Sequence, residues 1–542
     1  MLNSLTCEDE TLFHPHNPVL GNGKKCIVIG AGPAGLTAAY ELLKLNSGYE
    51  VIVLESSSEI GGISRTVKYH GNRMDIGGHR FFSKDPRVKA IWNELMPQQG
   101  APSFDDLRLG RNVPLCANGP DPEKEDLVML VRNRVSRIYY KNKFFDYPVK
   151  MNFKTICNMG VWTTFIAGMS YLATLFHKLP EDNLENFYIN RFGKKLYTMF
   201  FEGYTEKLWG RHPREISAEW GAQRVKGLSI LAILKDILSK IVPHSKRRHV
   251  ETSLIEEFNY PKFGPGQLWE TMADRICEMG GKISLNCEVK RFTVENNEIK
   301  NICVVENGEE VFYDADIFIS SMPLKELAAG LPDVPESVKE VAAGLPYRDF
   351  VTIGFLVNAL EVKNLTKLKT LNDIIPDCWI YVQDSGVKLG RVQIFNNWSP
   401  YLVADPENSV WIGLEYFCKE GDEFWNTDDA GLKKTGFEEL VKIGLLSARS
   451  TVLDFHIEKV PKAYPAYFDT YQNINKLIAH LNSIKNLYCT GRNGQHRYNN
   501  MDHSMVTSIE TVNNIVNNGC LDKTAIWEVN TEKEYHEENK HD

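Results

Sequence analysis

The sequence has no closely spaced cysteine pair, no excess of basic residues and only one long run without charge. Its eleven cysteines are scattered along the chain, odd in number, and none forms a C-x-x-C pair. This pattern argues against a zinc site, an iron–sulfur cluster or a disulfide framework, and it suits a reducing compartment. We therefore predict no metal site and a cytoplasmic protein.

The charge balance gives no support for nucleic-acid binding. The 542 residues include 62 Lys and Arg against 70 Asp and Glu, for a formal net charge of −8. An anionic ligand must therefore be held by local positive groups, because the overall field does not attract it. The length predicts two or three domains, and the composition is that of an ordinary globular protein.

Residues 155–176 form the one long run without a charged side chain. Its 22 residues have the length that spans a bilayer, but an asparagine, four threonines, a serine and two glycines dilute it. We predict a buried or interfacial helix, with membrane contact as the less favoured alternative. Residues 1–23 contain acids and prolines where a signal peptide would be basic and then apolar, so we expect a flexible leader there and a charged, disordered tail over 521–542.

The stretch "KKCIVIGAGPAGLTAAYELLK" (24–44) is the most informative part of the sequence. A short apolar strand leads into Gly30, Gly32 and Gly35, which supply G-x-G-x-x-G at the start of an apolar-periodic helix. The glycines permit a tight turn, close approach to a pyrophosphate and close helix–strand packing, and the helix N-terminus offers free N–H groups. Glu55 ends the next strand twenty residues after Gly35, where it could accept a hydrogen bond from a ribose hydroxyl.

Three later glycine clusters favour a flavin over a nicotinamide cofactor. "EIGGISRT" places Gly62, Ser64 and Arg65 where a second turn could neutralise a diphosphate. "DIGGHRFF" follows, with His79 after Gly77 and Gly78, whose backbone could lie flat against a planar ring. Near the other end, "LYCTGRNGQHRYNNMDHSM" leads through Gly491 and Arg492 into a helix that opens near Asp502, whose N-terminus could stabilise negative charge on a flavin. A cofactor contacted by both ends of the chain must be large, so we predict FAD.

A cation in the middle of an alternating strand raises a separate question. In "GRVQIFNNWSPY" (390–401), Val392 and Ile394 fall on one face and Arg391, Gln393 and Phe395 on the other. Taken alone, such an arginine is more often the partner of a neighbouring carboxylate than a ligand-binding group.

Together these motifs resemble the UDP-galactopyranose mutase branch of the FAD-dependent amine oxidase and protoporphyrinogen oxidase superfamily. Three more stretches, at 190–225, 377–401 and 491–505, are similar to eukaryotic-type mutases. The resemblance implies an α/β fold: a Rossmann-type FAD-binding domain, a helical substrate-covering segment and a mainly antiparallel β-sheet domain. The implied FAD-binding parts are 24–150, 258–345 and 485–520, the helical segment is 151–257, and the sheet domain is 346–484.

The resemblance also implies residue roles. His79 matches the histidine beside flavin N5, and Arg391 matches the arginine that clamps the substrate diphosphate; these are the expected catalytic residues. Tyr381, Tyr464, Tyr498 and Trp398 match aromatic residues of the substrate site. The implied cofactor-binding residues are Gly30, Gly32, Gly35, Glu55, Gly62, Ser64, Arg65, Gly78, His79, Val289, Gly491, Arg492, Met501, Asp502 and Ser504.

Two positions depart from the mutase pattern. Glu202 aligns with a second diphosphate-binding arginine, and Trp398 replaces a phosphate-facing tyrosine. An acid beside a diphosphate is unfavourable unless it is compensated. Three explanations remain open: Glu202 turns away, Lys207 or Arg211 substitutes for the missing cation, or the substrate is not UDP-galactose.

Two functions are therefore compared. The favoured one is a nucleotide-sugar pyranose/furanose mutase (an isomerase of polysaccharide biosynthesis), in which the resemblance implies that reduced flavin N5 attacks the anomeric carbon. The alternative is an FAD-dependent oxidoreductase acting on a saccharide, amine or isoprenoid. The sequence leaves open whether the protein forms a homo-oligomer and what reduces the flavin. NAD(P)H, if used, would visit transiently, because no second dinucleotide-binding unit is visible.

Overall fold

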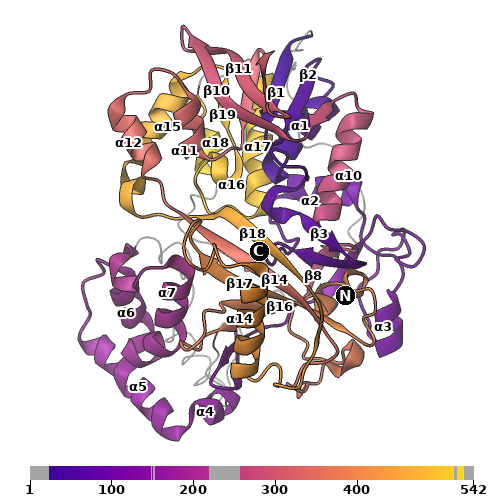
Figure 1. Ribbon diagram of the computed structural model, residues 1–542, viewed down its shortest axis with the longest axis vertical. Coiled ribbons are helices and arrows are strands. Elements are labelled where there is room, and N and C mark those ends of the chain that lie inside the picture. The colour runs from indigo at the N-terminus through magenta and orange to yellow at the C-terminus, as the bar shows by residue number, and fades with distance from the viewer. Residues whose placement is uncertain (1–22, 148, 150–152, 219–256, 518–521, 530–542) are drawn as a thin grey trace, which may run out of the picture.

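The computed structural model describes residues 23–147, 149, 153–218, 257–517 and 522–529. Figure 1 shows a parallel sheet with its helices in the upper part, a large sheet below it, and helices α4–α7 beside the large sheet. The expected leader at 1–22, residues 219–256 of the expected helical segment, and the tail from residue 530 lie outside the described residues. The predicted α/β architecture is confirmed.

A five-stranded parallel sheet forms the core of the upper part. Its order is β19-β13-β1-β2-β9, and every neighbouring pair is parallel. The strands are β1 (Lys25–Ile29), β2 (Glu50–Leu54), β9 (Lys282–Ser284), β13 (Ile317–Ser320) and β19 (Leu487–Cys489). The first and last strands among the described residues therefore join one sheet, as the predicted cofactor contact with both ends requires.

Helices or strands cover both faces of this sheet, because successive β1 side chains point to opposite sides. Cys26 and Val28 pack in one core and Ile27 and Ile29 in another. The first core contains α1 (Pro33–Lys44), α2 (Pro86–Leu95), α10 (Pro265–Glu278) and α17 (Met501–Val516). The second contains β10 (Cys287–Glu295), β11 (Glu298–Glu306), α11 (Leu324–Gly330), α12 (Glu336–Ala343) and α15 (Ile474–Ser483). Strand β12 (Glu309–Asp314) pairs with β11.

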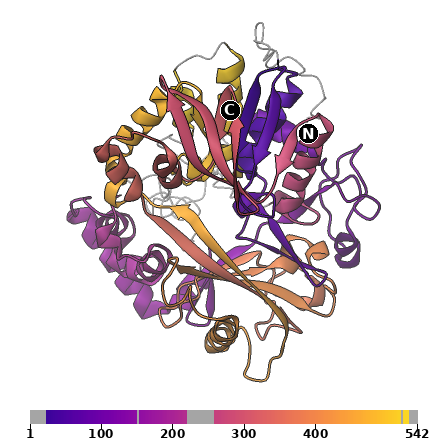
Figure 2. The same ribbon diagram turned by 45° about the horizontal axis from the view of Figure 1, so that its top comes forward.

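A seven-stranded sheet forms the lower part, with order β18-β14-β17-β16-β15-β6-β7. It is antiparallel except between β15 and β6. The strands are β6 (Ser136–Tyr140), β7 (Lys143–Asp146), β14 (Tyr347–Val357), β15 (Trp379–Val382), β16 (Arg391–Ile394), β17 (Val410–Cys418) and β18 (Val452–Pro465). Figure 2 shows β14 and β18 crossing the molecule as its longest strands. Helix α14 (Asp429–Lys442) packs on one face, and the other face looks toward the predicted site.

Short elements connect the two parts. Hairpin β3 (Thr66–Tyr69) and β4 (Asn72–Asp75) follows the second glycine cluster. Strand β5 (Met129–Asn133) pairs with β8 (Glu257–Pro261). Outside the helical lobe described next, the other α-helices are α3 (Phe104–Leu109), α13 (Phe395–Trp398), α16 (Gly491–Gly494) and α18 (Thr524–Glu528).

The helical lobe consists of α4 (Phe153–Met159), α5 (Val161–Phe176), α6 (Leu184–Tyr197) and α7 (Gly203–Trp209), with the π-helical turn Thr198–Glu202 before α7. Gly160, with φ of 83°, divides the uncharged run into two helices. Within the described ranges, no helix is long and apolar enough to cross a membrane.

Two expected domain boundaries need correction. Residues 136–146, assigned to the FAD-binding part, form β6 and β7 of the large sheet. Helix α15 at 474–483, assigned to the sheet domain, packs in the core beneath the parallel sheet. In both cases the chain crosses between the two parts inside a stretch without a compositional break, and the boundaries that the resemblance implied do not coincide with these crossings.

The expected tail at 521–542 also begins too early. Helix α18 at 524–528 buries Ile526 and Trp527, which are 2% and 6% exposed. Lys523 donates to the carbonyls of Ile484 and Leu487 at 2.8 and 2.6 Å. Two apolar side chains in a charged sequence were therefore enough to hold this segment against the core.

Candidate functional site

The first glycine loop has the predicted strand–turn–helix form. Gly30 has φ of 101°, and a Cβ on Gly35 would lie 1.8 Å from the carbonyl oxygen of Gly30. Only glycine fits both positions, since the first needs a left-handed backbone and the second leaves no space. The Glu55 carboxylate accepts from the backbone N–H of Ala31 at 2.7 Å and of Ser57 at 2.9 Å. Glu55 is thereby fixed beside the loop, where the ribose interaction was predicted.

A second glycine loop faces the first. A Cβ on Gly32 would lie 3.9 Å from the Cα of Gly62, and a Cβ on Gly62 would lie 3.4 Å from the Cα of Gly32. Gly61 N–H also donates to the carbonyl of Ala31 at 2.9 Å. The two loops thus form one backbone cradle at the N-terminus of α1, a suitable shape for a dinucleotide phosphate.

Arg65 has a different role from the one predicted. Its Nε lies 2.7 Å from Glu59 and its Nη2 lies 3.2 Å from Glu458 on β18. The guanidinium is therefore already neutralised by carboxylates, and neutralisation of a diphosphate by this side chain does not fit the structure. Instead, Arg65 ties the second glycine loop to the large sheet.

The C-terminal cluster closes the cradle. A Cβ on Gly491 would lie 2.6 Å from the Cβ of Ala34, and Ser508 Oγ donates to the carbonyl of Ala34 at 2.7 Å. The N-terminal half of α17 therefore packs against the first turn of α1. The predicted cofactor residues of α17 lie in its first turn: Met501, Asp502 and Ser504. Val289 lies in β10 and is 6% exposed. Two residues before it, the N–H of Cys287 donates to the carbonyl of Glu55, which ties this strand to the end of β2.

His79 lies between the two parts of the molecule. Burial, and then the positive charges of Arg492 and Arg391, lower the pKa of His79 to about 4. The imidazole is therefore neutral at physiological pH. The adjacent Gly78 is exposed, so its backbone is accessible to a planar ligand on one side.

Trp398 lies behind this loop and not in a substrate surface. It is fully buried, and its Nε1 donates to the carbonyl of Cys378 at 2.9 Å. A Cβ on Gly78 would lie 3.3 Å from Trp398 and 3.4 Å from Trp379. The prediction that Trp398 contacts substrate is wrong for this structure, because the side chain has no accessible surface; it supports the Gly78–His79 backbone instead.

Arg391 sits in a polar row across the large sheet. Tyr381, Arg391 and Glu415 are direct neighbours in register on β15, β16 and β17. Arg391 Nη1 lies 3.2 Å from Glu415, and Arg391 Nε donates to the hydroxyl of Tyr204 on α7 at 2.8 Å. The strand alternation around Arg391 is confirmed, with Val392 and Ile394 packed in the opposite core. A buried carboxylate partner, the commoner fate of such an arginine, is also present.

Arg391 nevertheless keeps a charge and an accessible donor. Burial opposes its charge, but Tyr204, Tyr464 and Glu415 raise the pKa of Arg391 well above its ordinary value. Its side chain is 17% exposed, whereas Glu415 is 1% exposed. Among the described residues, none accepts a hydrogen bond from Nη2 of Arg391, so an anion could bind there.

Two tyrosines and a second arginine complete the cluster. The rings of Tyr464 and Tyr498 stack at 5.6 Å, and the Arg492 guanidinium lies 5.3 and 4.0 Å from their centroids. Arg391 lies 5.8 Å from the Tyr464 ring. Burial raises the pKa of Tyr464, so its hydroxyl remains a proton donor. The structure therefore brings together His79, Arg391, Arg492, Tyr464 and Tyr498, which come from four separate segments.

The acid that replaced the expected second arginine is paired elsewhere. Glu202 lies 3.3 Å from Nε2 of His212. Arg211 pairs with Asp469 at 2.7 Å, and Lys207 Nζ donates to the carbonyls of Val382, Asp384 and Leu389 at 3.2, 2.6 and 3.1 Å. Neither Lys207 nor Arg211 is available to substitute for the missing cation. The helix presents Tyr204 to Arg391 instead.

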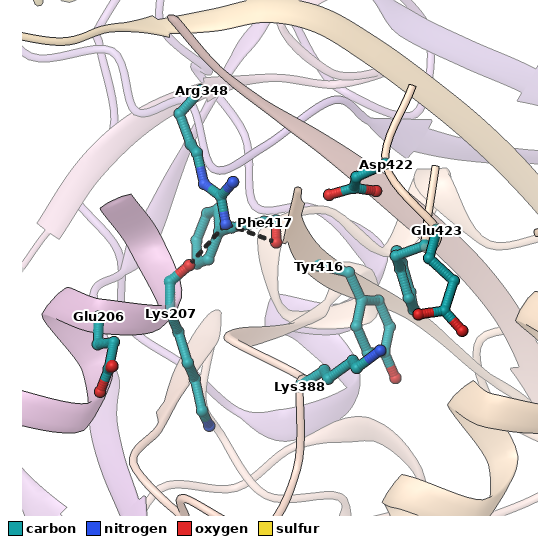
Figure 3. Close-up of a pocket in the computed structure, with 9 residues that line it drawn as sticks. Glu206, Lys207, Arg348, Lys388, Tyr416, Phe417, Asp422 and Glu423 are labelled. Atoms are coloured by element: carbon teal, nitrogen blue, oxygen red, sulfur yellow. Dashed lines mark hydrogen bonds between the residues drawn. The ribbon is translucent and has the colours of Figure 1, made fainter. Parts of the chain in front are cut away.

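A pocket of about 380 Å³ lies beside α7 (Figure 3) and is lined in part by Phe417, whose ring centroid also lies 4.9 Å from the Arg391 guanidinium. Arg348 donates there to the carbonyls of Leu208, Lys207 and Phe417 at 3.0 to 3.3 Å. Burial lowers the pKa of Lys207 to about 8. Both cations are thus used to fasten α7 to the large sheet, which fixes the position of Tyr204.

Comparison with known proteins identifies the family. The family model for flavin containing amine oxidoreductase matches residues 33–492, most of the chain. The chain belongs to the flavin containing amine oxidoreductase family.

Relatives within and near this family differ in function. The chain is 21% identical over 453 residues to 15-cis-phytoene desaturase of Arabidopsis thaliana, covering 81% of this chain and 70% of that protein. It is 22% identical over 496 residues to 4,4'-diapophytoene desaturase of Methylomonas sp, covering 84% and 85%. Its fold is similar to that of reduced UDP-galactopyranose mutase, with a TM-score of 0.73, 21% identity and coverage of 94% and 100%. A protoporphyrinogen oxidase-type structure from Exiguobacterium gives a TM-score of 0.61 at 15% identity.

Membership of this flavoprotein family implies FAD, and the residues present fit that cofactor. Neither Gly32 nor Gly62 places a Cβ in the cradle between the two loops, the N-terminus of α1 faces it, and Glu55 is fixed beside it. The residues that would hold FAD are therefore those of the two facing loops, with the first turn of α17 at the far end.

Two members of the site were not predicted. Tyr204 follows Glu202 by two residues in "FFEGYTEKLW", and Glu415 is a lone carboxylate in the apolar strand "VWIGLEYFC". A charged side chain on a buried strand usually has a partner of opposite charge, so the pairing of Glu415 with Arg391 could have been predicted from the sequence. Tyr204 depended on the π-helical turn before α7, for which the sequence has no clear signal.

Proposed function

We propose that this protein is an FAD-dependent nucleotide-sugar mutase that interconverts the pyranose and furanose forms of a nucleotide-diphosphate sugar. The observation that carries the proposal is the convergence of Arg391 and Arg492 on the stacked pair Tyr464 and Tyr498, beside a neutral His79. The fold similarity to reduced UDP-galactopyranose mutase supports it.

In such a reaction the protein must hold the departing diphosphate until it returns, because its escape would end the cycle. Arg391 would bind it through Nη2, while Glu415 and Tyr204 keep the guanidinium in place. The hydroxyl of Tyr464 would donate a further hydrogen bond, since burial raises its pKa. Arg492, over both tyrosine rings, would add positive charge without moving.

FAD, when bound in its reduced form, would supply the nucleophile for the anomeric carbon. His79, next to the accessible backbone of Gly78, would then offer the flavin a neutral hydrogen-bonding group. Its imidazole is neutral because burial and the positive charges of Arg492 and Arg391 lower its pKa. NAD(P)H remains the proposed transient reductant.

The test is anaerobic. The holoenzyme is reduced with dithionite, supplied with UDP- and dTDP-linked hexopyranoses, and the products are separated by chromatography. A ring-contracted product formed without net flavin oxidation is expected. Net oxidation of the flavin during turnover, or activity only with oxidised FAD, would overturn the proposal. Arg391→Gln should lower affinity for UDP at least tenfold, whereas Arg211→Gln, on a surface arginine paired with Asp469, should not.

A second candidate is an FAD oxidoreductase of a less anionic substrate. It is favoured by Glu202, which stands where the mutase pattern has its second arginine, and by Glu415, which offsets the charge of Arg391. The desaturases among the relatives are also redox enzymes by name. Stoichiometric reduction of FAD by a saccharide, amine or isoprenoid in the absence of dithionite would establish this function instead.

A further inference from the structure

The outer face of α5 is entirely apolar. Of the sixteen residues of α5, ten are exposed, and none of the ten is polar: Val161, Trp162, Phe165, Ile166, Gly168, Met169, Leu172, Ala173, Leu175 and Phe176. Val161, Trp162 and Phe176 are 81%, 73% and 90% exposed. A continuous stripe of this kind marks an interaction surface, whereas single exposed apolar residues do not.

The inner face of α5 is fixed to the rest of the protein. Ala167, Tyr171 and Thr174 are buried there, and the helix approaches α6 so closely that a Cβ on Gly193 would lie 2.7 Å from the backbone nitrogen of Tyr171. The N–H of Lys195 donates to Ser170 Oγ at 3.1 Å. The helix expected to be buried or interfacial is therefore buried on its inner face only; its outer face is exposed, and α5 lies at the edge of the molecule (Figure 1).

We propose that the outer face of α5 docks on an anionic lipid surface. A helix of this length extends about 24 Å, which is shorter than the hydrocarbon core of a bilayer. It would therefore lie in the interface plane, with Trp162, Phe165, Met169 and Phe176 inserted among the acyl chains. Gly160, at the kink before α5, separates it from α4, so the two helices do not form one spanning segment.

Charge complementarity favours an anionic lipid surface. Residues 153–218, which form the helical lobe, contain eight Lys and Arg against six Asp and Glu, a net charge of +2. Since the whole chain carries −8, the remainder carries −10. Exposed Lys154 and Lys178 flank the apolar run, while Glu181, before α6, and Glu185, on α6, are paired with Arg191 and Arg214. The protein would therefore approach an anionic surface with this lobe foremost.

A second copy of the chain is a poorer occupant. Two copies would each bring a net charge of −8 to the contact, and this self-repulsion opposes association. Insertion into a lipid surface needs only the apolar side chains of one helix.

Docking in this way would involve the helical lobe that contributes Tyr204 to the proposed site. Helix α6 packs on α5 and continues through the π-helical turn into α7, which carries Tyr204 to Arg391. Membrane binding through α5 would therefore act on the same rigid lobe that forms one wall of the proposed site, without inserting any site residue.

The test is flotation of full-length holoprotein with vesicles. Wild type is expected to float with phosphatidylcholine vesicles containing 30% phosphatidylglycerol, less with phosphatidylcholine alone, and less again at 0.5 M salt. Trp162→Ser/Phe165→Ser should lower the bound fraction at least tenfold. The matched control is Phe312→Ser on β12, which removes an aromatic side chain that is 62% exposed and should leave binding unchanged. FAD absorbance and Tm show that each variant is folded.

Three results would overturn the proposal. The first is absence of wild-type binding to either vesicle. The second is equal binding by wild type and by the double variant. The third is concentration-dependent self-association in sedimentation velocity that the double variant abolishes while vesicles compete poorly, which would make the face an interface between copies of the chain.

Discussion

Arg391 and Glu415 lie directly opposite each other on β16 and β17, with their charged groups 3.2 Å apart on the site-facing side of the large sheet. Glu415 is also held by Gln393, whose Nε2 donates to it at 3.0 Å. The pair therefore fixes the direction in which the remaining Arg391 donors point. It also couples any change at Arg391 to an uncompensated buried carboxylate.

Removing Arg391 alone should destabilise the protein as well as weaken nucleotide binding. Arg391→Met is expected to lower the free energy of unfolding by about 3–5 kcal/mol, because Glu415 stays buried without its partner. The double variant Arg391→Met/Glu415→Gln should regain most of that stability while UDP affinity remains lost. Denaturant unfolding and calorimetric titration with UDP measure the two effects. Recovery of UDP affinity in the double variant would contradict the role assigned to Arg391.

Gly35 should tolerate no side chain. In Gly35→Ala the new Cβ would meet the Gly30 carbonyl oxygen at 1.8 Å, so backbone must shift at the turn that faces the cofactor. We expect loss of FAD, read from the ratio of absorbance at 450 and 280 nm, and a free energy of unfolding lower by about 3 kcal/mol. Gly168→Ala on α5, where a Cβ meets nothing within 4 Å, should instead be neutral or slightly stabilising. Normal FAD content in Gly35→Ala would contradict the assignment of this loop to FAD binding.

Asp75 should make stability depend on pH. It accepts from Thr66 at 2.9 Å and from Tyr260, and burial raises the pKa of Asp75 from 3.8 to about 7 despite these hydrogen bonds. Its contribution is therefore fully present below pH 3.8 and is lost as the pH rises through 7. Between pH 5 and 8.5, Asp75→Asn should gain about 2–3 kcal/mol relative to wild type. Isothermal denaturation across this range measures the difference, and parallel curves for the two proteins would contradict it.

His79 should change the stability of the protein with pH in the opposite direction to Asp75. Its pKa is lowered from 6.5 to about 4, so the unfolded chain binds a proton in this range before the folded protein does. The folded state therefore loses stability as the pH falls below 6.5. His79→Gln should be less sensitive to acid than wild type between pH 6.5 and 4. The chemical shifts of ¹⁵N-labelled histidine report the protonation state of His79 directly. A protonated His79 at pH 6 would contradict the lowered pKa.

Helix α18 should be necessary for stability although it lies outside the parallel sheet. Trp527 packs in the core with the strands of the sheet, and its Nε1 donates to Asn482 at 3.0 Å. Trp527→Ala is expected to cost about 3–5 kcal/mol. Leu453→Ala, at a leucine that is 51% exposed on β18, should change stability by less than about 0.5 kcal/mol. Equal effects of the two substitutions would show that α18 does not dock.

Local patterns in the sequence determined the cofactor-binding half. Gly30, Gly32, Gly35 and Glu55 form the predicted strand–turn–helix because each requirement is local: a positive φ, a close approach or a fixed spacing along one βαβ unit. The alternation around Arg391 was predicted for the same reason, since side chains of a strand alternate regardless of what lies beyond. The resemblance of several motifs located the remaining site residues in the chain.

Only the tertiary structure decided what those residues touch. Arg65 meets Glu458, nearly four hundred residues later, and Trp398 lies behind Gly78 instead of beside a ligand. Pairings of this kind depend on strand register and on the crossing of the chain between two sheets, which no local pattern records. The outer face of α5 shows the same limit: the helix carries no charge on any side, and whether such a helix is buried depends on how many neighbours the fold provides.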